Sequence, residues 1–297
     1  NYGYSLFVDD AQRLWLATLG GGVSVYDANS QKFEQIWLSK LTDIKDSDGV
    51  FAIRQLGAER FVFATRSGLF TYDHKQRLLE AVTVSGSPSR TLGTVTDLAQ
   101  NGDTVFVSTL GQGVFIFDSA TGHLAPASSL ALGVRLQLPA VPIYSLSLHQ
   151  SQLFIATLSK GLFSARTNYN DIQAQLMRTD VMGDLTNITS ALALNDGQLV
   201  FGSFGAGLMR DDRQGGLQRL GQEVANTLAD TQIKRLMAQH PELNTAGILA
   251  VEYDRDRQKF YLGTTLGLWV LDFNAEQVIK YGEYRQVDIG YVNAIHL

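Results

Sequence analysis

One short segment of the sequence recurs six times, and this repeat constrains the fold more than any other feature. Each copy has an apolar stretch, a small residue and a Thr or Ser, then a short turn that ends in Gly, then Leu or Val and further strand-forming residues. The hydroxyl residues lie 44 to 61 positions apart, and they are Thr18, Thr65, Thr109, Thr157, Ser203 and Thr264. A period of about 40 to 50 residues with several strands in each unit predicts a β-propeller rather than a helical solenoid.

The same order of strands can be traced around each copy of the segment. A first strand and a short polar turn precede the apolar second strand, and the turn ending in Gly, here called the Gly turn, leads to a third and a weaker fourth strand. In the first copy these strands are about 4–8, 14–18, 23–26 and 32–36. The second strand is apolar at successive positions, which is typical of a sheet covered on both faces. Each repeat therefore predicts one four-stranded antiparallel blade.

The repeats predict a single all-β propeller over residues 1–297. Its six complete blades are expected at about 4–36, 50–82, 95–127, 143–176, 188–220 and 248–282, and residues 291–297 begin a seventh. An inserted amphipathic helix is expected at about 222–239, because apolar residues recur there at helical spacing and Pro241 follows. Since an open propeller would expose sheet edges, we expect sequence beyond these ends to supply the missing strands.

Composition excludes several classes of function. The chain has 297 residues, of which 45% are hydrophobic and 18% charged, so it can bury a large core. Its formal net charge of -5 gives no attraction for nucleic acid. The absence of Cys excludes disulfides, thiol catalysis and thiolate metal sites, and it leaves the redox compartment open. No apolar run is long enough for a membrane span, so any anchor or export signal is expected outside these residues.

One charged residue interrupts the otherwise uniform first strands. These strands recur at 50–53, 95–98, 143–146, 188–191, 248–251 and 292–295, and their third residue is small except at Asp97. A carboxylate facing the channel of a propeller needs a partner or water. Asp97 is therefore a candidate ligand-binding residue, and the alternative is a water-filled channel wall.

A second set of candidates lies in the loops. The connections between blades are long, at 37–49, 83–94, 128–142, 177–187 and 221–247, and in a meander they share one rim with the Gly turns. Loops on a rigid scaffold are where binding sites concentrate. The candidates are Arg66, Gln112, Lys160 and Phe204 in the Gly turns, and Arg90, Arg135 and Arg178 in the connections. They would suit an acidic or hydroxyl-rich ligand, and the alternative is that they are solvated loop residues.

An Asp follows the Gly of five of the six Gly turns at a fixed distance. These residues are Asp27, Asp73, Asp118, Asp212 and Asp272, and Arg166 is the exception. An Asp carboxylate readily accepts hydrogen bonds from the backbone of the next turn. We therefore expect these residues to shape turns rather than to bind a ligand.

The sequence has no motif for catalysis, for a metal or for a cofactor. It has no nucleophile elbow, phosphate loop or dinucleotide fingerprint, and its five His are scattered through different repeats. Asp43, Asp46 and Asp48 are similar to a calcium loop only in part, because the distal Glu is missing. The prediction is no catalytic residue, no metal and no cofactor.

The repeat itself resembles that of the two-component regulator propeller family. The resemblance is carried by residues 14–27, 63–73 and 262–272, and by the Leu-Thr-Asn-Ile segment at 185–188. It implies a seven-bladed propeller in the periplasmic part of an inner-membrane receptor, continued by a transmembrane helix and a histidine kinase or a GGDEF diguanylate cyclase. It also implies that ligands are often carbohydrate fragments. The resemblance assigns no ligand-binding residue to this sequence.

The resulting expectation is a non-catalytic periplasmic sensor that binds a small molecule, an oligosaccharide or a partner on the rim. The other expected partner is the rest of the receptor, and the sequence is compatible with a homodimer. This segment is expected to bind no nucleic acid and to make no contact with the membrane. One alternative is a polysaccharide lyase or glycosidase with Asp97 and Asp184 at the channel, which requires carboxylates about 5 to 9 Å apart. Another is a protein-interaction scaffold with a broad apolar patch on the rim.

Overall fold

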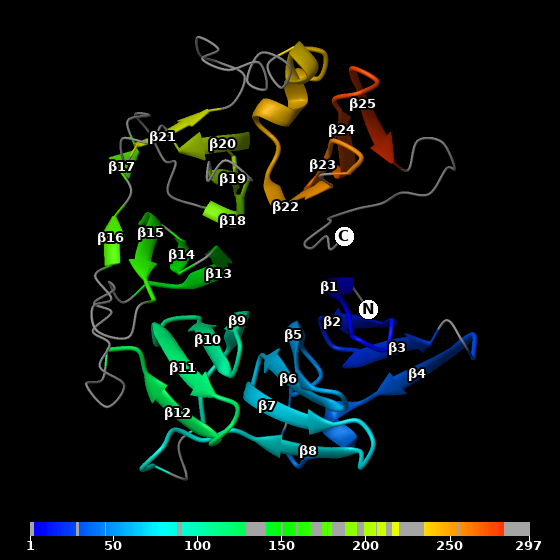
Figure 1. Cartoon of the computed structure of the whole chain (residues 1–297), viewed down its shortest axis with the longest axis vertical. Coiled ribbons are helices and arrows are strands. Elements are labelled where there is room, and N and C mark those ends of the chain that lie inside the picture. Colours follow the sequence, from blue (N-terminus) through cyan, green and yellow to red (C-terminus); the bar gives the residue numbers. More distant parts are fainter. Residues whose placement is uncertain are drawn as a thin grey trace. The chain divides into compact units, whose positions relative to one another are not determined.

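The computed structural model shows an all-β chain, and its sheets are the blades of a β-propeller (Figure 1). The structure describes residues 3–27, 30–44, 46–87, 91–128, 141–149, 151–158, 160–167, 174–176, 178–179, 188–194, 199–205, 207–211, 216–219, 235–254 and 256–281. Within these ranges there are six antiparallel sheets of four strands, one of which gains a fifth, parallel strand. The predicted fold class is confirmed.

The chain divides into two compact units, and the first comprises Asn1–Leu153 with Ala165–Ala174. It contains blades 1, 2 and 3 and the first strand of blade 4. The strands of these blades are β1 (Gly3–Val8), β2 (Arg13–Thr18), β3 (Val23–Asp27), β4 (Lys32–Ile36), β5 (Val50–Gly57), β6 (Arg60–Thr65), β7 (Gly68–Asp73), β8 (Leu78–Ala81), β9 (Val95–Asn101), β10 (Thr104–Thr109), β11 (Val114–Asp118), β12 (His123–Pro126) and β13 (Ile143–His149). A short 3-10 helix, η1 (Leu38–Lys40), lies between blades 1 and 2 in the sequence.

The second unit comprises Phe154–Ser164 with Gln175–Leu297, and the division runs through the sheet of blade 4. The remaining strands are β14 (Gln152–Thr157), β15 (Gly161–Arg166), β16 (Ala174–Leu176), β17 (Arg178–Thr179), β18 (Ile188–Ala193), β19 (Leu199–Ser203), β20 (Gly207–Asp211), β21 (Gly216–Arg219), β22 (Ile248–Asp254), β23 (Lys259–Thr264), β24 (Gly267–Asp272) and β25 (Gln277–Tyr281). Strand β17 lies in a connection expected to be a loop, and it pairs in parallel with β21 of blade 5. A two-residue edge strand has no periodicity that the sequence could reveal.

The expected insertion at 222–239 is described only from residue 235 onward. Residues 235–238 are helical, and the 3-10 helix η3 (Pro241–Asn244) follows. Leu236 and Met237 are buried in a cluster with residues of blades 5 and 6. The end of the insertion therefore packs on the sheets. Residues 222–234 and the expected start of a seventh blade at 291–297 lie outside the described residues.

The Thr of the repeat closes the Gly turn with two hydrogen bonds. Thr65 Oγ1 donates to Gly68 O at 2.9 Å and accepts from Ser67 N at 3.1 Å. The carbonyl of the turn Gly is likewise bound by the hydroxyls of Thr18, Thr109, Thr157 and Thr264. Gly68 has a φ of 131°, which only Gly adopts without strain, and a Cβ there would lie 3.1 Å from Leu92 O. The repeat signature is thus a turn held by one hydroxyl.

In blades 1, 2, 3, 5 and 6, the pair of first and second strands has a β-bulge at the second residue of the first strand. The bulged residues are Tyr4, Phe51, Thr96, Thr189 and Leu249. A bulge adds a residue that the partner strand does not match, and it turns that side chain out of the regular alternation. Each bulge therefore sets one side chain apart from the two faces of its sheet.

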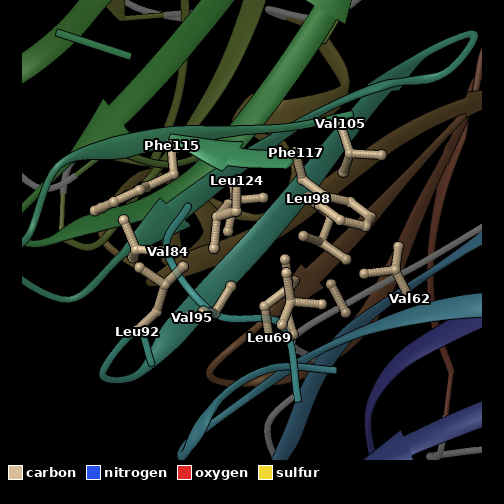
Figure 2. Packing of buried hydrophobic residues seen from close by; sticks show 14 residues of the cluster. Val62, Leu69, Val84, Leu92, Val95, Leu98, Val105, Phe115, Phe117 and Leu124 are labelled. Carbon is tan, nitrogen blue, oxygen red and sulfur yellow. The ribbon is translucent and has the colours of Figure 1, made fainter. Parts of the chain in front are cut away.

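Apolar side chains fill the space between neighbouring blades. Figure 2 shows the cluster between blades 2 and 3, where Val62 and Leu69 of blade 2 meet Leu98, Val105, Phe115, Phe117 and Leu124 of blade 3. The small residue before the repeat Thr, Ala64 in blade 2, belongs to the same cluster and is fully buried. A larger side chain there would overpack the layer.

The aspartates after the Gly turns shape turns, as the sequence predicts. Asp73 Oδ1 accepts from Gln76 N at 2.7 Å, and Asp118 and Asp272 each accept two backbone N–H groups of the following turn. Asp27 accepts from the hydroxyl of Ser30 at 2.9 Å. Asp212 lies outside the described residues.

Candidate functional site

The Gly turns and the connections between blades meet at one end of the blades of the first unit. Gly49, the residue before β5, pairs with Leu19 in the Gly turn of blade 1, and its carbonyl accepts from Arg66 N at 2.8 Å. Thr94, the residue before β9, donates its hydroxyl to Arg66 O at 3.0 Å and accepts from Leu110 N at 2.9 Å. The residues that enter blades 2 and 3 are thus each held between two Gly turns. We call this end of blades 1 to 3 the rim.

Two predicted binding residues share the rim. Arg66 and Gln112 are exposed and lie in the Gly turns of blades 2 and 3, which Thr94 joins. Glycines lie beside both side chains: a Cβ at Gly49 would be 3.4 Å from Arg66 Nε, and a Cβ at Gly93 would be 3.5 Å from Gln112 Nε2. A guanidinium and an amide therefore lie on exposed turns of neighbouring blades, and each has a glycine beside it.

Asp97 lies next to the bulged Thr96 and bridges blades 3 and 4. Its Oδ1 accepts from Leu98 N at 2.7 Å, and its Oδ2 accepts from Leu146 N of β13 at 2.8 Å. Arg54 Nη2 lies 3.9 Å from Oδ1. Burial raises the pKa of the Asp97 carboxyl, although the Arg54 charge and the backbone N–H groups act in the opposite direction. The side chain keeps 19% of its surface exposed, so this partnered carboxylate is still accessible.

Aromatic residues at the bulges add a feature that the sequence reasoning missed. Strands β1, β5, β9 and β13 neighbour one another in order (Figure 1). The Tyr4 ring meets the Phe51 ring edge to face at 5.0 Å. Burial, together with the charges of Asp97 and Tyr144, raises the pKa of Tyr4 to about 12, so these groups lie close together. The available signal was an aromatic residue directly before the third, usually small position of the first strand.

The rings and the ion pair together offer several kinds of contact. Tyr144 is 38% exposed, and the Arg54 side chain is 31% exposed. Aromatic rings provide flat apolar surface with a polar tip, while a carboxylate and a guanidinium provide an acceptor and donors. We call Tyr4, Phe51, Asp97, Tyr144 and Arg54 the bulge cluster.

The other predicted residues are placed as follows. Lys160 and Phe204 are exposed in the Gly turns of blades 4 and 5, in the second unit. A Cβ at Gly247 would lie 2.9 Å from the Phe204 ring, so Gly at that position makes room for it. Arg178 is the first residue of β17. Arg90, Arg135 and Asp184 also lie outside the described residues.

Neither a metal site nor a membrane-spanning helix is present within the described ranges. No group of three or more His, Asp or Glu within those ranges is arranged to hold a metal ion. No helix in the described part of the chain is both long and apolar enough to cross a membrane. Asp48 of the partial calcium-loop pattern instead binds Ser39, whose N–H donates to Asp48 Oδ1 at 3.0 Å.

Comparison with known proteins finds similarity in structure but not in sequence. No protein-family model matches the chain, and no curated protein matches it. The extracellular domain of the hybrid two-component system BT3049 from B. thetaiotaomicron is similar over 95% of this chain and 35% of its own, with a TM-score of 0.67 and 17% identity. That of BT4673 from the same organism is similar over 98% of this chain and 35% of its own, with a TM-score of 0.68 and 16% identity.

The chain is also similar in structure to a β-propeller that is not named as part of a two-component system. The Cps50 (Swd1) β-propeller domain of Myceliophteria thermophila matches over 89% of this chain and 80% of its own, with a TM-score of 0.62 and 12% identity. The chain spans about a third of the length of the two extracellular domains that it matches. The resemblance predicted from the repeat is thus confirmed at the level of the fold: this chain has the β-propeller fold found in the extracellular domains of two-component systems.

Proposed function

We propose that the chain is the extracytoplasmic, non-catalytic sensor part of a membrane-bound bacterial receptor, and that it binds a small ligand at the rim and the bulge cluster of the first unit. The output part of such a receptor would be a histidine kinase or a diguanylate cyclase. The observation that carries the proposal is the match of nearly the whole chain to extracellular domains of two-component systems. The repeat resemblance, found independently from the residues, points to the same class.

The chemistry of the first unit suits a hydroxyl-rich or acidic ligand, such as a carbohydrate fragment. Arg66 and Gln112 offer exposed donors on the rim, and their turns are held in place by Thr94. Tyr144 offers exposed ring surface, and Asp97 an accessible acceptor. Donors and acceptors around flat aromatic surface are the groups that recognise sugar hydroxyls and ring C–H groups.

The proposal can be tested by thermal shift with a panel of neutral and acidic oligosaccharides. A ligand that binds the folded state raises Tm by mass action. Replacement of both Arg66 and Gln112 by Ala should abolish the shift given by a binding sugar while leaving Tm without ligand nearly unchanged, because both side chains are exposed. The matched control is Arg60→Ala, which removes an exposed Arg at the opposite end of β6.

The outcomes separate the claims. If a sugar still raises the Tm of the double variant but no longer raises that of Tyr144→Ala, the binding site lies at the bulge cluster and not at the rim. A sugar whose shift survives in both variants would contradict a site in this region. Conversion of a sugar by the protein would contradict the non-catalytic assignment.

A further inference from the structure

A polar network joins blades 1 and 2 at the end opposite the rim. The Asp9 carboxylate is almost fully buried and accepts from Arg13 N at 2.8 Å, from Arg13 Nε at 2.6 Å and from Trp15 Nε1 at 2.8 Å. Arg13 Nη1 crosses to blade 2, where it donates to Glu59 Oε2 at 3.1 Å. With three donors, the Asp9 carboxylate is fully engaged. The Arg13 guanidinium thus bridges the junction between the two blades.

His74 of blade 2 completes this junction. Its ring meets Trp15 edge to face at 5.1 Å, and its backbone N–H donates to Glu59 O at 2.8 Å. Its Nδ1 is buried and has no hydrogen-bond partner among the described residues, and the same holds for Arg13 Nη2. The guanidinium lies over the same Trp15 ring, 5.7 Å from its centre. A neutral imidazole fits this place, whereas an imidazolium would put a second cation beside Arg13.

We propose that His74 makes the junction between blades 1 and 2 acid-sensitive: protonation of its half-buried ring, next to the Arg13 guanidinium, weakens the packing of blade 2 on blade 1. The charged groups that face the ring are Arg13 and Asp9 from blade 1, Glu34 from β4, and Glu59 and Arg77 from blade 2. Glu34 is bound to Arg77, and Asp9 is engaged by its three donors. Glu34 and Glu59 act to raise the pKa of His74, but each carboxylate is already paired with an Arg, Glu34 with Arg77 and Glu59 with Arg13.

The direction of the pH dependence follows from the two states of His74. Burial lowers the pKa of His74 in the folded chain, and the positive charge of Arg13 lowers it further. In the unfolded chain the pKa is that of a free His, about 6.5. Between the two values the unfolded state binds more protons, so stability falls as pH drops below about 6.5 and levels off below the folded-state pKa.

The test compares thermal unfolding at about pH 7.5 and about pH 5 for the wild type, His74→Gln and His123→Gln. His123 is a matched control, because its Nδ1 is also buried and has no hydrogen-bond partner within the described ranges, but its neighbour is the carboxylate of Asp118. The loss of Tm on acidification should be smaller by a few degrees in His74→Gln than in the wild type, and it should not be smaller in His123→Gln. An equal loss in the wild type and His74→Gln would overturn the proposal.

A second measurement does not depend on the variant folding. The NMR titration of the His74 ring in the wild type should have its midpoint below about 6.5, and Glu59→Gln should move that midpoint further down. A midpoint at or above the free value contradicts the proposal. If the chain lies outside the cytoplasm, this junction is exposed to the external pH. Because the titration needs no ligand, it tests the acid sensitivity of the junction independently of the proposed sensor function.

Discussion

A carboxyl side chain can be buried inside a blade at low energetic cost in two ways: its charge is compensated by hydrogen-bond donors, or it takes up a proton. Asp9 remains charged because three donors surround it, and its pKa is lowered although burial acts to raise it. Glu252 on β22 is the opposite case, since burial alone raises its pKa to about 7. The same type of group thus stays charged in one blade and takes up a proton near neutral pH in another.

Glu252→Gln should stabilise the protein at alkaline pH and not in acid. The folded-state pKa of about 7 lies above the ordinary value of 4.5 for Glu, so the wild type loses stability as pH rises from about 4.5 to about 7. Gln has no charge to bury, so the variant should show a higher Tm than the wild type at about pH 8 and an equal one near pH 4.5. A constant difference in Tm across this range would mean that Glu252 does not titrate as described.

At the scale of the element, one hydroxyl makes the Gly turn. The Thr holds the carbonyl of the turn Gly in five blades, and in four of them it also binds an N–H within the turn. In blade 5 the equivalent Ser203 is buried, and its Oγ has no hydrogen-bond partner among the described residues. The same position therefore stabilises the turn in one blade and contributes little in another.

Thr65→Val and Ser203→Ala form a matched pair that tests this difference. Thr65→Val removes both hydrogen bonds from a buried turn and should lower the free energy of unfolding by about 1–3 kcal/mol. Ser203→Ala removes a hydroxyl that has no partner, so the free energy of unfolding should be unchanged or slightly higher. Both can be measured by urea denaturation. Equal losses in the two variants would show that the hydroxyl hydrogen bond is not what the Thr contributes.

At the scale of the whole molecule, the blades of the first unit are joined by hydrogen bonds between their first strands. Thr96 Oγ1 donates to Ile143 O at 2.7 Å, and Gln100 Nε2 donates to Gln55 O at 3.0 Å. Asp97 accepts from Leu146 N in the same region. These contacts join residues about 45 to 49 positions apart, which is one repeat. In the second unit, the Thr189 hydroxyl donates in the same way to Ile248 O.

Thr96→Val should weaken the junction between blades 3 and 4. The change leaves the carbonyl of Ile143 and the hydroxyl of Ser108 without their buried partner, so we expect a loss of about 1–3 kcal/mol in the free energy of unfolding. The control is Thr94→Val on the rim, where water can replace the hydrogen bond to Arg66 O and the loss should be smaller. Calorimetry of the two variants would decide, and a larger loss for Thr94→Val would contradict this account.

The sequence by itself determined the blade. A recurring pattern of apolar strand, Thr and Gly turn specifies local hydrogen bonds and two-sided burial within about 40 residues, and so it predicted the sheets, the turn aspartates and the fold. It also placed Arg66 and Gln112 on exposed Gly turns, because exposure of a turn follows from its position between buried strands.

Only the tertiary structure decided which side chains meet across blades. The pairing of Asp97 with Leu146 N, the gathering of aromatic residues at the bulges and the bridge from Arg13 to Glu59 each join different repeats. Periodicity shows which residues are buried, but it does not show which residue of the next blade a side chain faces, because that depends on bulges and on the stacking of sheets. Charges and rings therefore find their partners only when the blades pack.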